Sequence, residues 1–572
     1  MVIDFSSFKE PDQNYEFTGR ILFRIIYDQT TRQFRCLTRN IRLLDDLQKA
    51  FKAENPSAFF MKQYGYDVDP DVFFVNSLGL FPLGLIFDVI KYITTAYGNL
   101  EVLSMSECAK RVITTCLRPL NPPSKNIGED WVPDNIADDS GVNDIIYAKD
   151  GTPGFKYRPY QMEAVKKLIL AARGRGMIEI PTAGGKSLII ANFVYNVVKY
   201  FEPDSQVLVL VPNKQLVVQM YRDFVSYGWK KPDLTIMSGG KITLDGYKLE
   251  KYNKDAKVIF ANRQYVMKNT QLLPKIGILF VDECHSAVAD ATSNFINNLP
   301  CSVKVGCSGT IPKQGADKYK LTGMLGNVVY RENITMLQEA GYISRVVIDE
   351  IDITDENVHP DMLFHLRPRR RYNPIDYNGI DFDEAYKDEV EYMNANFSRE
   401  YSPILEIMEK KMKGNTLVLF DLLELGRGMF DLAKEHGLGG KDIFYIDGST
   451  DVSERERIRD LFEQSGNNVL FAQAAVMSTG TNIKRLNNLV ILFRSKSTVR
   501  VIQSIGRILR LHEDKVVARV YDIRFNMKYS QKHFKERVDL YKRFYGIKPI
   551  ASYNITIPKE EKKDPEKQET PL

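Results

Sequence analysis

Short runs of apolar, largely β-branched residues alternate with longer segments of helical periodicity through most of the chain. Between residues 177 and 307 these runs are MIEIP, VLVLVP, KVIFA, ILFVD and VKVGC. Between residues 416 and 523 they are TLVLF, IFYID, VLFAQ, LVILF and RVYDI. Continuous apolar runs of this length are typical of parallel strands that are covered on both faces. The helical segments between them make βαβ units, so the pattern predicts two consecutive α/β domains.

The first 125 residues have a different pattern. ILFRIIY, DQTTRQ and FRCLT, over residues 21–38, predict a strand, a turn and a second strand. Helical periodicity follows at 43–53 and 84–97, and a segment rich in Pro, Asn and Asp begins near residue 119. These features predict a small N-terminal domain of mixed strands and helices, followed by a linker.

Composition places the chain among ordinary globular proteins, with 44% hydrophobic residues and a net charge of +5. The six cysteines form no C-x-x-C pair, and we expect reduced thiols in a cytoplasmic protein. The most apolar stretch, residues 78–97, contains Pro82, Asp88 and Lys91, so a buried helix fits it better than a membrane span.

The sequence IPTAGGKS, residues 180–187, ends as a phosphate-binding loop ends, but Ile180 stands where that loop has its first glycine. It lies between a predicted strand and a predicted helix, whose N-terminus attracts phosphate oxygens. Lys186 would reach the β and γ phosphates of ATP, and Ser187 would bind Mg²⁺. The alternative is a glycine turn at a helix start. The expected nucleotide-binding residues of this loop are Thr182, Ala183, Gly184, Gly185, Lys186 and Ser187.

About a hundred residues later, the strand ILFVD continues into ECH and so ends in two carboxylates. Asp282 would hold Mg²⁺, and Glu283 would orient and deprotonate the attacking water. An acidic strand end that faces solvent is the alternative, which a preceding phosphate loop makes less probable.

D-E-C-H together with I-P-T-A-G-G-K-S resembles the superfamily 2 helicases, whose phosphate loop usually lacks the first glycine. This resemblance implies that Gln161 of RPYQ reads the adenine ring, although a polar residue at a helix start would look the same. It also implies that CSGT, residues 307–310, links the ATP and nucleic-acid sites, whereas the plain interpretation of this segment is a strand-end turn. The residues expected to couple the two sites are His285, Ser308, Gly309, Thr310 and Gly480.

Further segments resemble the strand-contacting motifs of these helicases. They are VPNKQLVVQ, GGK and ANRQ in the first half, and YIDGSTDVSERERI and MSTGTNIKRL in the second. The last segment departs from the family pattern, since Asn482 stands where an aspartate is frequent. The nucleic-acid contacts that these motifs imply are Asn213, Gly239, Gly240, Asn262, Arg263, Gly448, Ser449, Ser478 and Thr479.

The segment QSIGRILR, residues 503–510, fits the sixth helicase motif. Gln503, Arg507 and Arg510 stand at i, i+4 and i+7, so one helix face presents all three side chains. The resemblance implies that they act in catalysis opposite Lys186, where an arginine stabilises charge on the transferred phosphoryl group. A solvated basic helix is the alternative.

Two longer segments, residues 64–93 and 384–420, resemble the UvsW family of phage recombination helicases. The family implies an ATP-driven motor on branched DNA that migrates junctions and regresses forks, with R-loop RNA as a further substrate. A basic segment at 31–42 supports a duplex contact, although a solvated charged face would look the same. The arginines expected to touch phosphates there are Arg32, Arg35 and Arg39.

The sequence thus predicts an ATP- and Mg²⁺-dependent DNA helicase that acts as a monomer in the cytoplasm, or in the host cytoplasm if a phage encodes it. An RNA helicase, the motor of a restriction-type translocase and a non-hydrolysing ATP-gated clamp remain alternatives. The predicted fold is α/β, with two tandem RecA-like parallel-sheet domains after a small α+β domain. The predicted boundaries are 1–125 for the N-terminal duplex-binding domain, 126–144 for the linker, 145–335 and 336–557 for the RecA-like domains, and 558–572 for a disordered tail.

Overall fold

The computed structural model divides the chain into two compact units, which are considered one at a time. The first comprises Met1–Pro181 and Gly185–Glu332, and the second comprises Thr182–Gly184 and Asn333–Leu572. The residues that the structure describes are 21–38, 40–55, 57–63, 66–98, 102–116, 133–134, 157–170, 174–239, 243–244, 247–248, 252–359, 362, 382–477, 483, 485–492, 498–512, 515 and 517–559.

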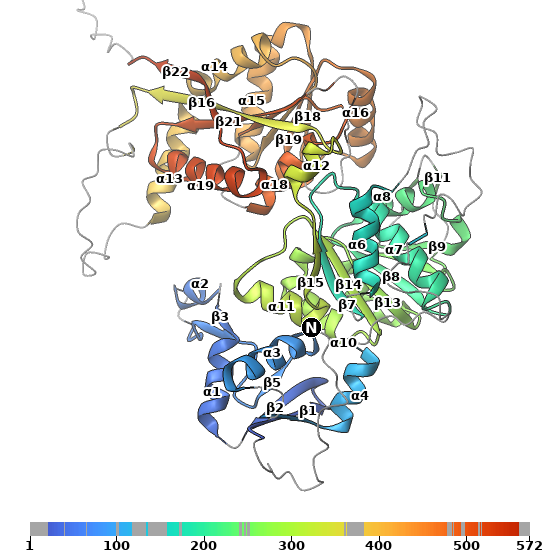
Figure 1. The fold of residues 1–572 in the computed structure, drawn as a ribbon. Helices are drawn as coiled ribbons and strands as arrows, with labels where there is room; N and C mark the ends of the chain where they lie inside the picture. The colour runs from blue at the N-terminus through green and yellow to red at the C-terminus, as the bar shows by residue number, and fades with distance from the viewer. Residues whose placement is uncertain are drawn as a thin grey trace, which may run out of the picture. The chain divides into compact units, whose positions relative to one another are not determined.

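A seven-stranded parallel sheet forms the centre of the first unit (Figure 1), in the order β15-β7-β14-β13-β8-β12-β9. Parallel strands all end at the same edge, so the loops that follow the neighbouring strands β7, β14 and β13 lie together. The strands are β7 (Arg175–Glu179), β8 (Gln206–Val211), β9 (Leu234–Met237), β12 (Val258–Asn262), β13 (Ile276–Val281), β14 (Val303–Ser308) and β15 (Val328–Arg331). The helices are α6 (Pro159–Leu170), α7 (Lys186–Tyr200), α8 (Lys214–Ser226), α9 (Arg263–Lys268), α10 (Asp290–Asn298) and α11 (Gly315–Leu325).

Both faces of this sheet are buried. Val207 and Val209 of β8 lie in a core with residues of α6, α7 and α8. Leu208 and Leu210 of the same strand lie in a second core with residues of α9, α10 and α11. Because alternate side chains enter opposite cores, every position of the strand must be apolar, which explains the unbroken hydrophobic runs in the sequence.

The N-terminal domain is a small mixed sheet with helices and belongs to the first unit. Its strand order is β5-β2-β1-β6, with β1 antiparallel to β2 and parallel to β6. The strands are β1 (Phe23–Asp28), β2 (Gln33–Thr38), β5 (Leu80–Phe81) and β6 (Leu103–Met105), and a separate hairpin pairs β3 (Lys52–Glu54) with β4 (Asp71–Phe73). The helices are α1 (Ile41–Ala50), α2 (Ala58–Gln63), α3 (Ile86–Tyr97) and α4 (Glu107–Cys116), with a 3₁₀ turn, η2, at Leu83–Leu85.

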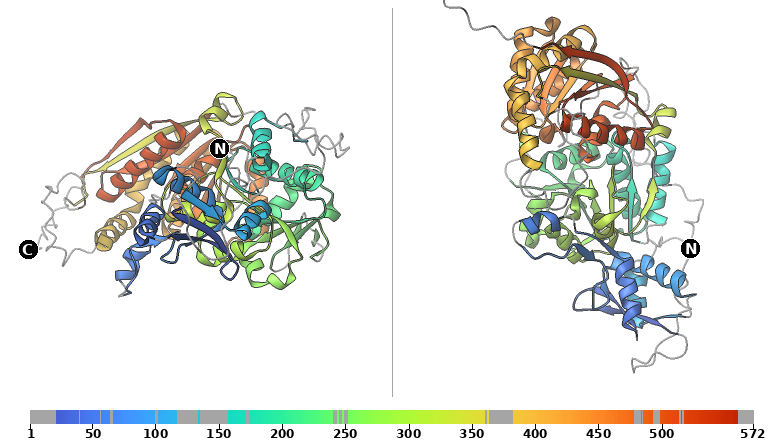
Figure 2. Two further views of the ribbon diagram at one scale, coloured as in Figure 1. Left: turned by 60° about the horizontal axis from the view of Figure 1, so that its bottom comes forward. Right: turned by 90° about the vertical axis from the view of Figure 1, so that its left-hand side faces the viewer.

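Helix α11 packs on the sheet of the first unit and also contributes residues to the core of the N-terminal domain. Figures 1 and 2 show the N-terminal domain beside this part of the unit. Ala316 is buried among the residues of that core. The Tyr319 ring lies 5.0 Å from Phe74 and 6.0 Å from Phe51, measured between ring centroids. The Tyr319 hydroxyl donates a hydrogen bond to the Ala50 carbonyl at 3.3 Å. The two parts therefore share apolar surface through one helix.

The closest approach of these parts is between backbones. A Cβ atom added to Gly84 of η2 would lie 2.0 Å from the Thr322 carbonyl oxygen. A Cβ atom added to Gly323 would lie 2.9 Å from the Pro82 ring. Only glycine fits at such a distance, so these two positions set how closely the N-terminal domain meets α11.

The second unit has its own seven-stranded parallel sheet, in the order β18-β19-β17-β20-β21-β16-β22. Residues of α14 and α15 form a core on one face. The strands are β16 (Arg345–Asp355), β17 (Thr416–Phe420), β18 (Asp442–Ile446), β19 (Asn468–Gln473), β20 (Asn488–Ile491), β21 (Val517–Phe525) and β22 (Ile550–Ile557). The helices are α12 (Ile334–Glu339), α13 (Phe382–Ala395), α14 (Phe397–Lys410), α15 (Leu423–His436), α16 (Val452–Gln464), α17 (Ala474–Met477), α18 (Thr498–Ile508) and α19 (Lys528–Tyr545).

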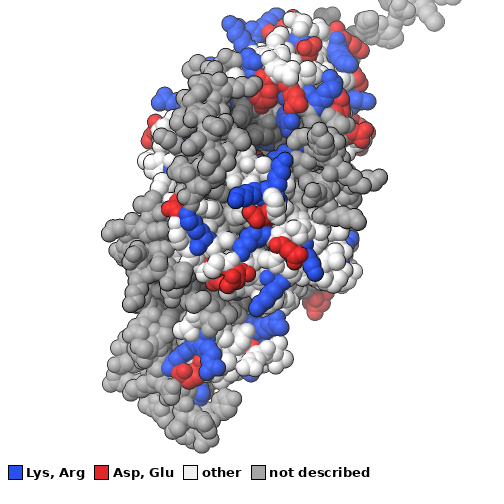
Figure 3. All heavy atoms as spheres, turned by 90° about the vertical axis from the view of Figure 1, so that its right-hand side faces the viewer, with Lys and Arg blue, Asp and Glu red and all other residues white. Residues whose placement is uncertain are grey.

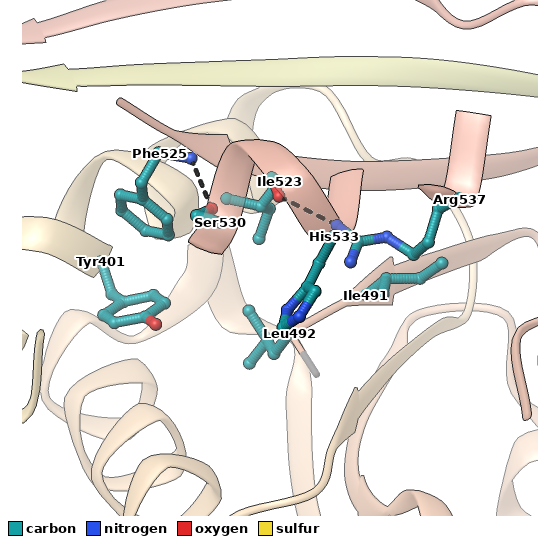
Figure 4. Close-up of a pocket in the computed structure, with 8 residues that line it drawn as sticks. All are labelled: Tyr401, Ile491, Leu492, Ile523, Phe525, Ser530, His533 and Arg537. Carbon is teal, nitrogen blue, oxygen red and sulfur yellow. Dashed lines mark hydrogen bonds between the residues drawn. The ribbon is translucent and has the colours of Figure 1, made fainter. Parts of the chain in front are cut away.

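A buried ion pair fixes α19 to this sheet. Arg537 of α19 donates from Nε and Nη2 to both oxygens of the Asp522 carboxylate of β21, and the Tyr541 hydroxyl donates to the same carboxylate at 2.5 Å. Arg537 also lines a small pocket beside Ser530 and His533 (Figure 4). A buried charge needs such full pairing. Helix α19 in turn contacts α18, which carries the first six residues of QSIGRILR, through a hydrogen bond from the Tyr545 hydroxyl to the Ile502 carbonyl.

The predicted fold class is confirmed, because two seven-stranded parallel sheets follow a small N-terminal domain of strands and helices. All ten predicted motor strands are present. The sequence interpretation missed the other four strands of the two seven-stranded sheets, β9, β15, β16 and β22, and the short hairpin of β10 (Thr243–Leu244) and β11 (Tyr247–Lys248). Among the described residues no helix is long and apolar enough to cross a membrane. A second basic cluster of the sequence, RPRRRY at 367–372, which could also contact phosphates, lies outside the described residues.

Gly84→Ala should lower stability, because the added Cβ meets a carbonyl oxygen that cannot move independently of α11. Overpacking of this kind costs about 1–3 kcal/mol. Thermal unfolding of the full chain measures the effect. Gly448→Ala is the control, since its Cβ would make only an ordinary contact of 3.7 Å. Equal melting temperatures for the two variants would contradict the close approach described above.

Candidate active site

The loop after β7 has the backbone of a phosphate cradle. Ala183 and Gly185 both have positive φ, 68° and 72°, and Gly185 is the N-cap of the fifteen-residue helix α7. Alternating left-handed and right-handed residues turn successive N–H groups toward one concavity, which binds anions. The N-terminus of α7 adds its partial positive charge. Lys186 is the first residue of this helix and Ser187 the second.

Gln161 closes one side of this loop. It lies on α6, is 3% exposed, and its Oε1 accepts a hydrogen bond from the Arg158 backbone N–H at 3.0 Å. This is the reciprocal half of a capping box, which the plain interpretation of a polar helix start had suggested. Its Nε2, however, would lie 2.4 Å from a Cβ added to Gly185. Gln161 therefore also packs directly on the phosphate loop.

Three charges meet at the carboxyl ends of β7 and β13. The Lys186 Nζ lies 3.1 Å from Oε1 of Glu283. Asp282, at the end of β13, is 5% exposed and accepts a hydrogen bond from the backbone N–H of Glu283. Glu283 has φ of 45°, in the left-handed region that non-glycine residues seldom adopt. This turn points the two consecutive carboxylates along different directions.

The pKa values reflect this crowding. Burial would lower the pKa of Lys186, but Glu283 and Asp282 raise it above its usual value. Burial would likewise raise the pKa of Glu283, but Lys186 and His285 hold it well below its usual range. Burial, followed by the neighbouring Glu283 charge, raises the pKa of Asp282. Glu283 is therefore ionised at neutral pH, as a group that accepts a proton from water must be.

Ser308 joins the end of β14 to this cluster. Its hydroxyl donates to Oε2 of Glu283 at 3.3 Å and lies 2.7 Å from Nδ1 of His285. The same oxygen accepts a hydrogen bond from the Thr310 N–H. The residues predicted to couple two sites, His285, Ser308 and Thr310, thus lie within one hydrogen-bonded group around Glu283. Gly309 lies between the last two, and Gly480 is outside the described residues.

Two residues that the sequence did not single out complete this edge of the sheet. Glu179, the last residue of β7, accepts hydrogen bonds from the Ile311 N–H and from Nε of Arg331. It therefore joins the strand before the phosphate loop to the segment after β14. The Cys307 thiol donates to Oδ1 of Asp282 at 3.2 Å, and burial raises the pKa of that thiol well above its usual value. The strand pattern alone carries no signal for either contact.

Arg263 does not lie where a strand-contacting residue would. Its side chain is 5% exposed. Its guanidinium donates to the carbonyl oxygens of Asp282 and Glu283 and to the Ser286 hydroxyl. A group that is buried and engaged in this way is not available to a nucleic-acid phosphate in this conformation. The Arg263 side chain contacts instead the turn that carries the two carboxylates.

The two predicted asparagines act locally as helix caps. The Asn213 side chain accepts from the Leu216 N–H at the start of α8. Asn262 accepts from the Tyr265 N–H at the start of α9, and its Nδ2 donates to the Pro212 carbonyl. Gly239 packs under the Tyr265 ring, and Gly240 lies outside the described residues.

Several predicted residues belong to the second unit. Gly448 and Ser449 form an exposed turn after β18, in which Ser449 donates two hydrogen bonds to Asp447. Arg507 lies on α18, and Arg510 follows its end; both are partly buried. The side chain of Gln503, and Ser478 and Thr479 entirely, lie outside the described residues.

The arginines of the N-terminal hairpin differ in exposure. Arg32 lies in the turn between β1 and β2 and is exposed, as is Arg42 at the start of α1. Arg35 donates to the Leu78 carbonyl at 2.9 Å, and Arg39 lies outside the described residues. On the face drawn in Figure 3, basic and acidic side chains are interspersed among the described residues. Surface charge alone therefore does not mark a nucleic-acid track there.

ATP with Mg²⁺ fits this site. Two carboxylates share it with one ammonium group, so a divalent cation beside Asp282 would offset the excess negative charge. Mg²⁺ needs only one or two protein oxygens besides phosphates and water, and Asp282 and Ser187 are the candidates. The Ser187 hydroxyl lies 2.8 Å from the Tyr227 hydroxyl. The backbone N–H groups of the loop and Lys186 would hold the phosphates, and Gln161 borders the loop.

Comparisons with known proteins match both units. Residues 154–313 match the family described as the type III restriction enzyme res subunit, and residues 400–512 match the helicase conserved C-terminal domain. The ATP-dependent DNA helicase uvsW of Enterobacteria phage T4 is 28% identical over 367 residues, which are 64% of this chain and 67% of that protein. The alignments with the first curated relatives span about half to two thirds of their own lengths.

One solved structure has a similar fold. The type ISP restriction-modification enzyme LlaBIII bound to DNA superposes with a TM-score of 0.52 over 71% of this chain and 31% of its own, at 15% identity. The crystal structure of T4 UvsW aligns over 94% of this chain and 100% of its own, at 21% identity and a TM-score of 0.41.

Glu283→Gln should leave ATP binding intact and lower the hydrolysis rate by about 10²-fold or more, because the amide keeps the shape of the side chain but cannot accept a proton. Nucleotide affinity is read with a fluorescent ATP analogue, and turnover by phosphate release. If affinity falls as much as turnover, Glu283 has a structural role instead.

Gly185→Ala should abolish nucleotide binding while the protein stays folded. The new methyl group would meet Nε2 of Gln161, and φ of 72° disfavours alanine. Gly315→Ala is the control, because its φ of 80° is equally unfavourable for alanine but its added Cβ would meet no atom within 4 Å, and it should keep its affinity for the same ATP analogue. An unchanged affinity in Gly185→Ala would refute the cradle.

Proposed function

We propose that this chain, a superfamily 2 helicase ATPase that resembles the UvsW family, is a DNA helicase that remodels branched DNA. Its substrates would be junctions and forks, on which it drives branch migration and fork regression, and R-loops are a further class. ATP is the energy source, with Mg²⁺ as the accompanying ion.

The observation that carries the ATPase part is the cluster of Lys186, Asp282 and Glu283 at the strand ends. In this structure Glu283 is the partner of Lys186. The phosphates of ATP would compete for that ammonium group, and Glu283 would then be left with Ser308 and His285 as partners. In that state it can accept a proton from the attacking water. Mg²⁺ would supply charge stabilisation for the transferred phosphoryl group.

Arg507 and Arg510 of the second unit stay predicted catalytic residues. An arginine that stabilises the transferred phosphoryl group contributes roughly 10³–10⁵ in rate. Helix α18 carries Arg507, and the buried Asp522–Arg537 pair, acting through α19, supports its position.

DNA is preferred as the substrate for two reasons. The phage T4 relative is named an ATP-dependent DNA helicase. In addition, the N-terminal domain is fixed to the first sheet through α11, so a duplex arm held by that domain would move with the first sheet. A motor that pulls one strand acquires a preference for junctions only through such a second contact.

A restriction-type translocase is the second candidate function. The family matched by residues 154–313 and the fold of LlaBIII both favour it. Such a motor moves along duplex DNA without separating its strands. Displacement of a triplex-forming strand from intact duplex would therefore support a translocase, whereas strand separation at a junction would support a helicase.

The test of the proposal is ATP-dependent activity of the full chain on four substrates at equal concentration. These are a four-way DNA junction, a forked DNA, an R-loop and an RNA duplex. We expect junctions and forks to be processed fastest and to stimulate hydrolysis most. Preference for the RNA duplex would overturn the DNA assignment, and absence of hydrolysis with every nucleic acid would overturn the motor itself.

Removing the exposed charges of Arg32 and Arg42 together, as Arg32→Gln and Arg42→Gln, should weaken junction binding. If each contacts a phosphate, the log–log salt slope should flatten by about 0.9 per lost contact. Hydrolysis on single-stranded DNA should not change, because the N-terminal domain is remote in sequence from the ATP residues. Arg111→Gln, an exposed arginine of α4 in the same domain, is the matched control. Equal salt slopes for all three proteins would contradict the duplex contact.

A further inference from the structure

Arg263 is a buried cation whose hydrogen bonds are directed at the turn that carries the two carboxylates. Nη2 donates to the Asp282 carbonyl at 2.6 Å and to the Glu283 carbonyl at 2.9 Å. Nη1 donates to the Ser286 hydroxyl at 2.6 Å, and that hydroxyl donates in turn to the Glu283 carbonyl at 2.8 Å. One guanidinium thus binds both peptide carbonyls of the Asp282–Glu283 pair.

These two carbonyls flank the strained residue of the site. Glu283 has φ of 45° and ψ of 51°, and a non-glycine residue held in that region costs on the order of 1–3 kcal/mol. Such a conformation persists only where the surroundings hold it in place. The Arg263 guanidinium is a charged donor that holds this turn in place through its two carbonyls. Charge-assisted hydrogen bonds are about twice as strong as neutral ones.

The position of Arg263 in the chain also connects this contact to the predicted nucleic-acid motifs. It directly follows Asn262, the last residue of β12, whose side chain donates to the carbonyl of Pro212. Pro212 precedes Asn213 at the start of α8. Arg263 therefore connects the two segments that resemble strand-contacting motifs, VPNKQLVVQ and ANRQ, to the backbone of Glu283.

We propose that Arg263 is a positioning residue for the catalytic base: it holds the left-handed turn at Glu283 and so places that carboxylate for proton transfer. The inference rests on the proposed ATPase function. The guanidinium contacts the Asp282 and Glu283 carbonyls and the Ser286 hydroxyl, so we expect its effect on turnover to pass through the turn at Glu283.

The experiment is a double-mutant cycle in the full chain, with Arg263→Gln, Glu283→Gln and both together. Arg263→Gln should lower the turnover number by about tenfold or more, because the base is displaced, while ATP affinity changes little. In the Glu283→Gln background the same change should alter turnover by less than about twofold, since residues that act as a unit are not additive. Lys268→Gln is the matched control: it removes one positive charge from the exposed side of α9 and should change neither value.

A second measurement reads the turn directly. Hydrogen exchange of the peptide that spans 282–286 should become faster in Arg263→Gln and stay unchanged in Lys268→Gln. Arg263→Lys should recover part of the turnover, because an ammonium group can reach one of the two carbonyls. If Arg263→Gln does not fold, as judged by its melting transition, Arg263→Lys takes its place in the cycle.

Outcomes separate this inference from the proposed function. A wild-type chain that hydrolyses ATP, with effects of Arg263 and Glu283 that multiply, overturns the positioning role alone. Unchanged turnover in Arg263→Gln, or parallel losses of affinity and turnover, does the same. A wild-type chain without any ATP hydrolysis overturns the ATPase function itself.

Discussion

The first unit depends on one largely buried cluster of charges, in which Lys186, Asp282 and Glu283 meet at the carboxyl ends of β7 and β13. Each charge is costly to bury alone, and together they remain short of one positive charge. The neighbouring side chains donate hydrogen bonds, as an excess of negative charge requires. The Cys307 thiol, the Ser308 hydroxyl and the Arg263 guanidinium each donate a hydrogen bond to this group or to its backbone. We therefore expect a polyphosphate and its cation to bind at this site.

The fold was readable from the sequence wherever burial on both faces demanded unbroken apolar runs. The predicted class and the resemblance to superfamily 2 helicases and to UvsW are confirmed by the sheets, the two matched domains and the phage relative. The missed strand β16 shows the limit of that pattern. Its sequence RVVIDEIDITD carries four acids, and Arg519 and Arg524 of the neighbouring β21 pair with three of its carboxylates. Such cross-strand pairing stabilises the strand but is invisible in a single run of residues.

The site shows the same limit at the level of side chains. Spacing placed Asp282, Glu283 and Ser308 at strand ends and Lys186 at a helix start, because those positions follow from local order in a parallel α/β sheet. Spacing could not reveal that Arg263 turns inward, since its direction depends on a strand two places away in the sheet. The role of each residue in catalysis stays a prediction.

The contact between Gly84 and Thr322 has a consequence for how this architecture can be recombined. A domain joined by a flexible linker can be exchanged between related proteins without changing the rest of the chain. This N-terminal domain, however, packs against α11 of the first sheet, where Ala316, Tyr319 and Gly323 contact it. A chimera that transplants residues 1–125 onto another motor would need that motor's equivalent of α11 replaced as well. A substitution on the surface of the N-terminal domain that contacts α11 would therefore require a compensating substitution in that helix, although α11 begins only at Gly315.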